Sequence, residues 1–197
     1  MGEQREYAVP EMRALLRTVT RVAVTLRVSG VRFALTGGCA IFARGGPGTE
    51  HDVDVLLREQ DGHQALQALV QADLRADKPL VGDWLLKAYD EGRLVDLLFR
   101  SAGRPVDDEM LNSAEELRVG AVTMPVMPAT FLVVEKLLVL DLHYCDFAQL
   151  LPVVRALREQ VDWRRVRAET AHSPYAQSFL FLTERLGITP PPEDVAA

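Results

Sequence analysis

The first half of the chain alternates between helical and extended hydrophobic patterns. Apolar residues recur at helical spacing over 10–28, where Pro10 suits a first turn and Gly30 suits the exit, so a helix is predicted there. The other helices expected in this half are 39–43, 62–74 and 113–117. The last of these is predicted because Ser113 and Glu116 have the spacing of a capping box. The segments expected to be extended are 31–35, 51–57, 84–89, 93–99 and 119–126.

The pattern becomes wholly helical after Pro128. Four helices are expected over 129–142, 147–160, 163–171 and 174–186. The sequence therefore predicts an α+β fold, in which a small mixed sheet flanked by helices is followed by a C-terminal helical bundle. We expect an α/β lobe over 1–127, a helical lobe over 128–189 that completes the functional cleft, and a flexible tail over 190–197.

Composition narrows the class of protein. With 197 residues, 48% hydrophobic and 25% charged, the chain has the size of one domain, or of one with an appended lobe, and is not disordered. Its net charge of −6 argues against indiscriminate coating of nucleic acid but leaves room for a local basic groove. Two cysteines, a charged N-terminus and no apolar stretch long enough to cross a bilayer predict a soluble, cytoplasmic protein without a signal peptide or a membrane partner.

Three aspartates are candidate metal ligands. Asp52 and Asp54 alternate along the strand at 51–57, so both point to one face, about 7 Å apart at the backbone. Two carboxylates forced together repel unless a cation lies between them, and hard oxygen ligands suit Mg²⁺. Asp96 interrupts the apolar run at 93–99, where a lone buried aspartate is costly unless it is paired or metal-linked. On a neighbouring strand it would complete a cluster able to hold two metal ions.

The glycine pair Gly37 and Gly38 lies between the strand at 31–35 and the helix expected after it. A glycine backbone approaches an anion closely, so the pair is a candidate grip for a triphosphate whose metal the aspartates would hold. The alternative is a plain turn, with Asp52 capping the start of its strand. We favour the phosphate site because the glycines and the carboxylates require one another.

The segment Leu35-Thr36-Gly37-Gly38, followed by Asp52-Val53-Asp54, resembles the signature of the nucleotidyltransferase superfamily, which has the DNA polymerase β-like fold. This resemblance covers about residues 31–100. It implies a nucleotidyltransferase-like sheet, a nucleoside triphosphate as substrate and Mg²⁺ as cofactor. A serine is common after the first glycine of the signature, so in this chain a hydroxyl contact to phosphate would come from Thr36 or Thr49.

The second half of the chain is similar to the AbiEii/MenT group of nucleotidyltransferase toxins. The similarity rests on Met127-Pro128 before a helix that carries Glu135-Lys136-Leu137, and on the segment at 143–150. It implies that Lys136 and Asp146 are needed for activity. In that group nucleotides, typically pyrimidines, are transferred to the 3′ end of tRNA, which blocks aminoacylation and translation, and a cognate antitoxin protein restrains the enzyme. CTP or UTP is therefore the implied substrate.

Several candidate residues have a second interpretation. Lys136 interrupts a helix that is apolar nearly all round, so it either meets an anion, such as a triphosphate or Asp146, or snorkels to the surface. Cys39 and His51 are expected to be structural. His143 stands where the toxin group carries another aspartate and is expected to be packed or hydrogen-bonded. A dense basic cluster is either a track for phosphates or a set of solvated helix faces: Arg155, Arg158, Arg164, Arg165 and Arg167.

Three functions remain open at this point. The first is a Mg²⁺-dependent toxin that adds nucleotides to tRNA, with these catalytic residues: Asp52, Asp54, Asp96, Lys136 and Asp146. The second is AMP transfer by the same site to a protein or a small hydroxylated molecule. The third is an inactive scaffold, which the presence of all three candidate ligands disfavours.

Overall fold

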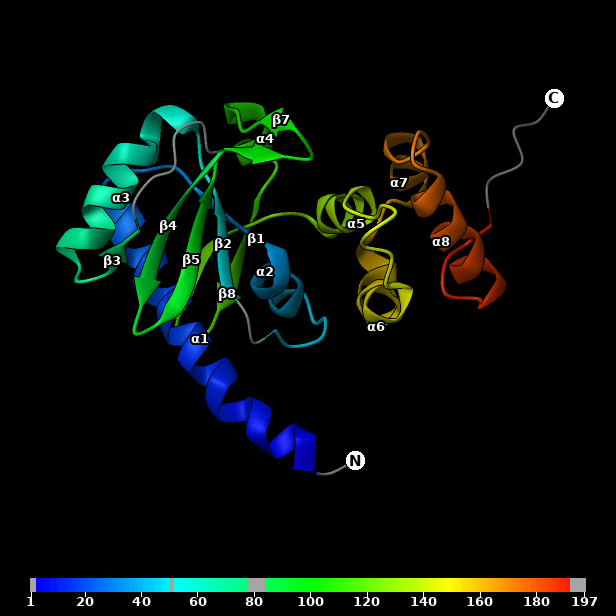
Figure 1. Cartoon of the computed structure of the whole chain (residues 1–197), viewed down its shortest axis with the longest axis horizontal. Coiled ribbons are helices and arrows are strands. Elements are labelled where there is room, and N and C mark those ends of the chain that lie inside the picture. The colour runs from blue at the N-terminus through cyan, green and yellow to red at the C-terminus, as the bar shows by residue number, and fades with distance from the viewer. Residues whose placement is uncertain (1–2, 50–51, 78–83, 192–197) are drawn as a thin grey trace. The chain divides into compact units, whose positions relative to one another are not determined.

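The computed structural model of the chain describes residues 3–49, 52–77 and 84–191 (Figure 1). The chain forms two compact units. The first comprises Met1–Ala43 and Gly48–Met127, and the second comprises Arg44–Pro47 and Pro128–Ala197. A short loop after the first part of the α/β unit therefore belongs with the C-terminal helices.

A mixed β-sheet forms the centre of the first unit. Within the described residues its seven strands lie in the order β3-β4-β5-β2-β1-β9-β8. Their bounds are β1 Ala34–Thr36, β2 Asp52–Leu56, β3 Arg75–Ala76, β4 Leu85–Asp90, β5 Arg93–Leu98, β8 Glu115–Val119 and β9 Val122–Val126. Strand β2 pairs in parallel with β5 and antiparallel with β1, so it lies at the middle of the sheet. A separate short pair consists of β6 Arg100–Ser101 and β7 Arg104–Pro105.

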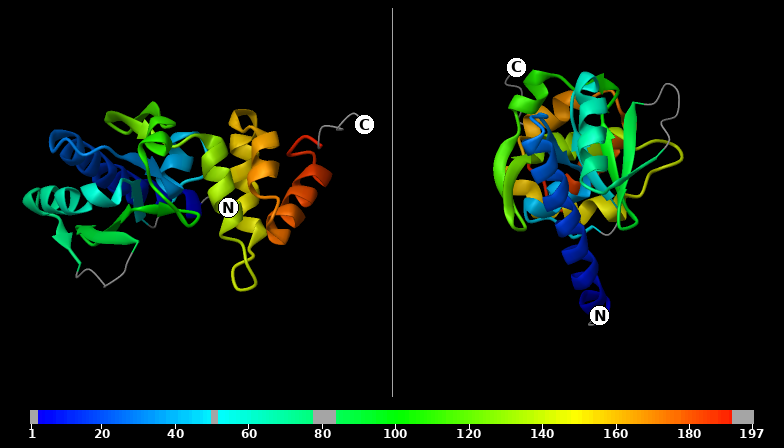
Figure 2. Two further views of the ribbon diagram at one scale, coloured as in Figure 1. Left: turned by 90° about the horizontal axis from the view of Figure 1, so that it is seen from above. Right: turned by 90° about the vertical axis from the view of Figure 1, so that its left-hand side faces the viewer.

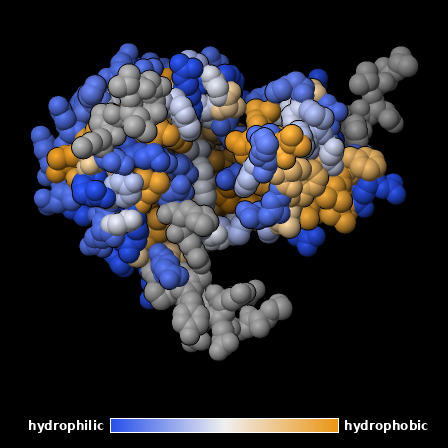
Figure 3. Space-filling view, viewed as in Figure 1, coloured by the Kyte–Doolittle hydropathy of each residue, from blue (hydrophilic) through white to orange (hydrophobic). Residues whose placement is uncertain are grey.

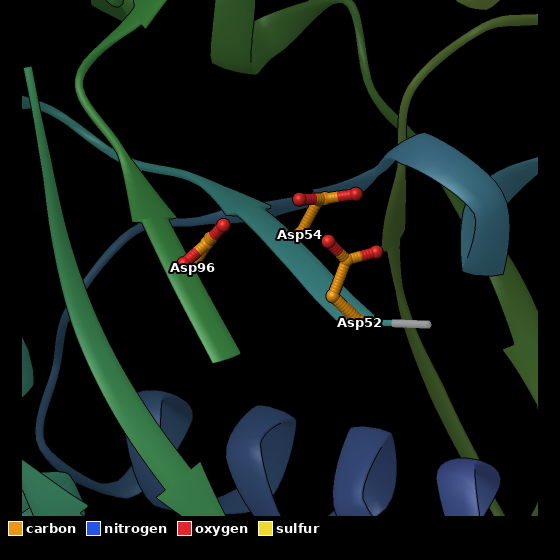
Figure 4. A group of neighbouring side chains, drawn as sticks. All are labelled: Asp52, Asp54 and Asp96. Atoms are coloured by element: carbon orange, nitrogen blue, oxygen red, sulfur yellow. The ribbon is translucent and has the colours of Figure 1, made fainter. Parts of the chain in front are cut away.

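Two helices cover one face of this sheet. Helix α1 (Glu3–Val28) contacts β2, helix α3 (Gly62–Gln71) contacts β4, and the two helices contact each other. The strand residues Val53, Ala88 and Val95 on this face have no exposed surface. Residues that alternate with them point to the other face, and Figure 4 shows three aspartates there, with turns of α1 on the opposite side. The remaining helices of this unit are α2 Gly37–Ala43, η1 Glu59–Asp61 and α4 Asp108–Asn112.

The second unit is built from helices. Their bounds are α5 Ala129–Leu138, α6 Phe147–Leu157, η2 Arg158–Gln160, α7 Trp163–Glu169 and α8 Pro174–Arg185 (Figure 2). Helix α5 contacts α6, α7 and α8, and the rings of Phe147 and Phe179 meet edge to face with their centroids 5.2 Å apart. Each of α6, α7 and α8 begins at a side chain that caps it, namely Asp146, Asp162 and Ser173.

Part of the apolar surface of the helical unit is exposed. Phe181 and Leu186 lie on and just after α8, and Leu142 lies after α5, with 66%, 51% and 77% of their surface exposed. Figure 3 shows hydrophobic residues over this unit. Among the helices that the structure describes, none combines the length and the apolar character needed to cross a bilayer.

The predicted fold class is confirmed: a mixed sheet flanked by helices is followed by helices. The helix predicted over 113–117 is wrong. Helix α4 lies just before it, capped by Asp107, and Ser113 follows the end of α4 instead of starting a helix. The predicted segment falls largely on β8, because an antiparallel partner, β9, is available directly after a turn at Gly120. Tertiary pairing here outweighs the local capping pattern.

Several helix ends also differ from expectation, and two of them differ most. Helix α1 begins at Glu3, so Pro10 lies inside it rather than in its first turn. The helix expected over 129–142 ends at Leu138. Its early end has a local cause, since the Asp141 carboxylate accepts hydrogen bonds from the backbone N–H groups of His143 and Tyr144 at 2.7 and 2.8 Å and so holds a turn.

Candidate functional site

The candidate site is a row of three carboxylates on two adjacent strands. Asp52 and Asp54 alternate on β2, and Asp96 lies on β5 directly beside Asp54 in the parallel register. One carboxylate oxygen of each residue lies within 4.8 Å of those of the other two (Figure 4). The alternation along β2 therefore gives both of its aspartates to one face, and the register of β5 adds the third.

Asp96 is the most buried of the three, with 9% of its surface exposed. Burial raises the pKa of its carboxyl group, Lys87 lowers this pKa, and the charge of Asp52 raises it further. Its Oδ1 atom has no hydrogen-bond partner among the described residues and lies 3.9 Å from the Nζ of Lys87. Asp96 is thus a buried acid. The ammonium group of Lys87, which pairs with it, lies near the longest distance at which an ion pair is counted.

The glycine pair meets the acid cluster directly. Gly37 has a φ of +61°, and a Cβ atom at this position would overlap the carboxylate of Asp54. A Cβ on Gly38 would lie 2.7 Å from the Oγ1 of Thr49. Only glycine satisfies both the left-handed backbone and the close approach at position 37. The chain therefore bends directly beside the carboxylate of Asp54, and the next residue, Gly38, lies against Thr49.

Cys39 packs beside this glycine corner and contacts the strand that carries Asp52. Its Sγ donates to the backbone carbonyl of Asp52 at 3.4 Å, and only 1% of its surface is exposed. Burial, followed by the charges of Asp54 and Asp52, raises the pKa of the thiol to about 12. A thiol that stays protonated is a packing group and not a nucleophile, in agreement with the expected structural role.

The donor set suits a hard divalent cation. All three ligand candidates are carboxylates, which match Mg²⁺ rather than a softer metal. The buried Oδ1 of Asp96, which has no hydrogen-bond donor among the described residues, is an acceptor that a cation would satisfy. The residues present therefore fit a Mg²⁺ site held by these three aspartates.

The two remaining predicted residues belong to the helical unit. Lys136 lies in the last turn of α5, is half-buried, and forms no ion pair among the described residues. Asp146 is exposed and accepts a hydrogen bond from the backbone N–H of Ala148 at 3.0 Å, so its local role is to cap α6. His143 is exposed as well. His51 lies outside the described residues.

The basic cluster on this unit is partly neutralised. Arg158, Arg165 and Arg167 form ion pairs with Glu159, Glu169 and Glu184, respectively. These pairs favour solvated helix faces over a phosphate track for three of the five arginines.

Two residues beside the site were not predicted, or not chosen, from the sequence. Lys87 on β4 pairs in register with Asp96, so it extends the row of charged side chains across a third strand. The sequence could have predicted this pairing, because the hairpin turn expected at 90–92 fixes which residues of the two strands face each other. Thr49 was named only as one of two possible hydroxyl donors, and the structure places it, rather than Thr36, against Gly38.

Comparison with solved structures identifies the fold class. The antibiotic-resistance factor ANT(2'')-Ia, in its solution structure, aligns over 89% of this chain and 95% of its own, with 13% identity and a TM-score of 0.52. The crystal structure of ANT(2'')-Ia with adenylyl-2''-tobramycin aligns over 88% and 95% of the two chains, with 14% identity and a TM-score of 0.51. The chain thus has a nucleotidyltransferase-like α+β fold.

Sequence comparison adds no further assignment. No protein-family model matches the chain, and no curated protein matches it either. A structural match at 13–14% sequence identity establishes a shared fold alone. The reaction has to be argued from the site itself.

Proposed function

We propose that the chain is a Mg²⁺-dependent nucleotidyltransferase toxin that adds nucleotides, pyrimidines from CTP or UTP, to the 3′ end of tRNA, with a cognate antitoxin protein as its restraint. One observation supports the chemistry most directly: three carboxylates from adjacent strands converge within 4.8 Å beside a glycine corner. The choice of tRNA as acceptor rests on the resemblance of the second half of the chain to the AbiEii/MenT toxins.

Each part of the site has a task in this reaction. Asp52, Asp54 and Asp96 would hold Mg²⁺, and Gly37 and Gly38 would leave their backbone open to the triphosphate. Bound Mg²⁺ lowers the pKa of an attacking hydroxyl and neutralises charge on the departing pyrophosphate. The acceptor oxygen forms a bond to the α-phosphorus, the bond from this phosphorus to the pyrophosphate oxygen breaks, and pyrophosphate leaves.

Asp96 takes the proton that the acceptor hydroxyl loses. A carboxylate placed beside the acceptor oxygen can serve as the general base. In the proposal, Lys136 neutralises developing charge on the triphosphate, and Asp146 positions Lys136 or the nucleotide. The cap that Asp146 provides to α6 is compatible with this second task, because one of its carboxylate oxygens accounts for the capping bond.

The test is nucleotide transfer by the purified full chain. It is incubated with Mg²⁺, tRNA and each α-labelled nucleoside triphosphate in turn, and tRNA 3′ ends are then sequenced. We expect label on tRNA, strongest with CTP or UTP, and only background with Asp52→Asn, which preserves side-chain size. If tRNA is never labelled, or if Asp52→Asn labels it equally, the proposal is wrong.

A second candidate is adenylyl transfer to a small hydroxylated molecule. It is favoured by one observation, the shared fold with a protein crystallised with adenylyl-2''-tobramycin. The same purified chain with labelled ATP and a panel of aminoglycosides distinguishes the two, since a labelled small molecule and unlabelled tRNA would identify this alternative.

A further inference from the structure

We propose that the outer strands β3 and β4 form the acceptor-binding surface, through Lys87, Tyr89 and Arg75, and that this surface takes a single-stranded polyanion such as an RNA 3′ end. The inference rests on the proposed nucleotidyl transfer and names the side of the site and the class of acceptor. We call these three residues the β3–β4 surface.

Sheet order gives the row of site residues a direction. Lys87, Asp96 and Asp54 are register partners on β4, β5 and β2, and Thr36, the residue before Gly37, continues the row on β1. The glycine corner therefore lies at one end and Lys87 at the other. In an in-line displacement the nucleophile enters opposite the leaving group. With pyrophosphate held at the glycine end, the acceptor must come from the Lys87 end.

The residues at that end share one face of the sheet. Tyr89 follows Lys87 by two positions on β4, and Arg75 on β3 is the register partner of Tyr89. The guanidinium of Arg75 lies over the Tyr89 ring, 4.6 Å from its centroid, and the Tyr89 hydroxyl donates to Asp77 at 3.4 Å. The ring is thereby held by one contact from β3, to Arg75, and one from Asp77, which directly follows β3. Arg75 is exposed, and Lys87 and Tyr89 are half-buried.

A stacked Arg–Tyr pair next to a lysine suits single-stranded nucleic acid. Bases stack on aromatic rings and on guanidinium planes, and ammonium groups contact the phosphates between them. Lys87 keeps 41% of its side chain exposed, so its charge is available to a phosphate as well as to Asp96. A polycationic acceptor would instead meet the positive charges of Lys87 and Arg75 on this surface, each of which lies near a carboxylate among the described residues, Asp96 and Asp77 respectively.

The opposite charges of Lys87 and Asp77 make the acceptor class testable. Binding of a fluorescently labelled single-stranded RNA to the full chain is measured by anisotropy with Mg²⁺ and without nucleoside triphosphate, over a series of salt concentrations. For Lys87→Gln or Arg75→Gln we expect weaker binding and a salt slope smaller by about 0.7, the loss of one phosphate contact. For Asp77→Asn we expect tighter binding, because a repulsive charge is removed.

The ring is tested separately from charge. Tyr89→Phe keeps the stacking face, and we expect it to bind as the wild type does, whereas Tyr89→Leu should weaken binding about fivefold or more. The matched control is Arg17→Gln, which removes an exposed arginine on α1, the helix that lies on the other side of the sheet. It should leave affinity and salt slope nearly unchanged.

The outcomes separate this inference from the proposed function. RNA binding that is absent, or that is insensitive to Lys87, Arg75 and Tyr89, overturns the β3–β4 surface even if tRNA is labelled in the transfer assay. Binding of tobramycin that weakens in Asp77→Asn and strengthens in Lys87→Gln identifies a cationic acceptor and overturns it too. Failure of nucleotidyl transfer with these binding effects intact would instead refute the reaction.

Discussion

At the scale of single residues, the site depends on how closely backbone and side chains approach. The corner at Gly37 leaves no room for a methyl group, because the Asp54 carboxylate occupies the position that a Cβ would take. Asp96 is buried, and among the described residues only a distant ammonium faces its Oδ1. The candidate metal site therefore depends on how closely the chain brings these groups together, and not on residue identity alone.

The corner can be tested by adding one methyl group. Gly37→Ala should destabilise the chain by about 1–2 kcal/mol through its positive φ, and should also weaken Mn²⁺ binding because Asp54 is displaced. Gly30→Ala is the control: its φ is +73°, but a Cβ there meets nothing within 4 Å, so it carries the backbone strain alone. Denaturant unfolding and calorimetric Mn²⁺ titration give the two readouts. Equal Mn²⁺ affinity in both variants would contradict the close contact.

Cys39 gives a second residue-scale prediction, in alkaline solution. The thiol has a pKa of about 12 in the folded chain against 9.0 for an unperturbed thiol, so the folded state holds the proton more tightly. The stability that this group contributes is complete below pH 9 and is lost as pH rises from there towards 12, by about 1.4 kcal/mol per pH unit. Urea unfolding across this range should show a steeper loss for the wild type than for Cys39→Ala. Parallel curves would show that the thiol is not perturbed.

At the scale of elements, alternation along one strand was sufficient to predict the pair Asp52 and Asp54, whereas the place of Asp96 beside them depends on which strands are neighbours. Asp52 and Asp54 share a face in any regular strand, and Asp96 needed only to lie on a neighbouring strand. The helix wrongly predicted at 113–117 shows the opposite case. Its capping pattern is local, whereas β8 exists because β9 returns beside it after Gly120, and pairing between segments is not visible in a local motif.

Asp146 is the N-cap of α6 and has a proposed catalytic role, and substitution can separate the two. As the N-cap of α6 it should contribute about 0.5–2 kcal/mol, which Asp146→Ala would remove and Asp146→Ser would largely keep. If Asp146 also positions the nucleotide or Lys136, Asp146→Ser should lose transfer activity while its unfolding curve stays close to that of the wild type. Full activity in Asp146→Ser would leave capping as its whole role.

At the scale of the whole molecule, the order of the strands could not be derived from the sequence. The patterns indicate the strands, but they do not show which strands are neighbours, and the sheet places β2 between β5 and β1. That order decides that Lys87 lies at one end of the acid row and the glycine corner at the other. The identity of the acceptor therefore becomes a structural question, although the three candidate metal ligands were visible in the sequence.

The candidate metal site also links the proposed function to the stability of the molecule. Three carboxylates within 4.8 Å repel one another without a cation, so Mg²⁺ or Mn²⁺ should raise the unfolding free energy, by about 2.7 kcal/mol at a hundredfold excess over the dissociation constant. Asp52→Asn should unfold at a higher temperature than the wild type in EDTA, because repulsion is reduced. It should lose most of the metal-induced shift.

The two tryptophans allow this linkage to be assigned to the first unit. Trp84 belongs to the sheet unit and Trp163 to the helical unit, so a Trp163→Phe background leaves Trp84 as the fluorescent reporter. In this background thermal unfolding followed by Trp84 emission should shift upward with Mn²⁺, and Asp73→Asn, at an exposed position after α3, should keep the whole shift. A Trp84 transition that does not respond to metal, or that responds equally in Asp52→Asn, would show that the three aspartates do not bind a cation.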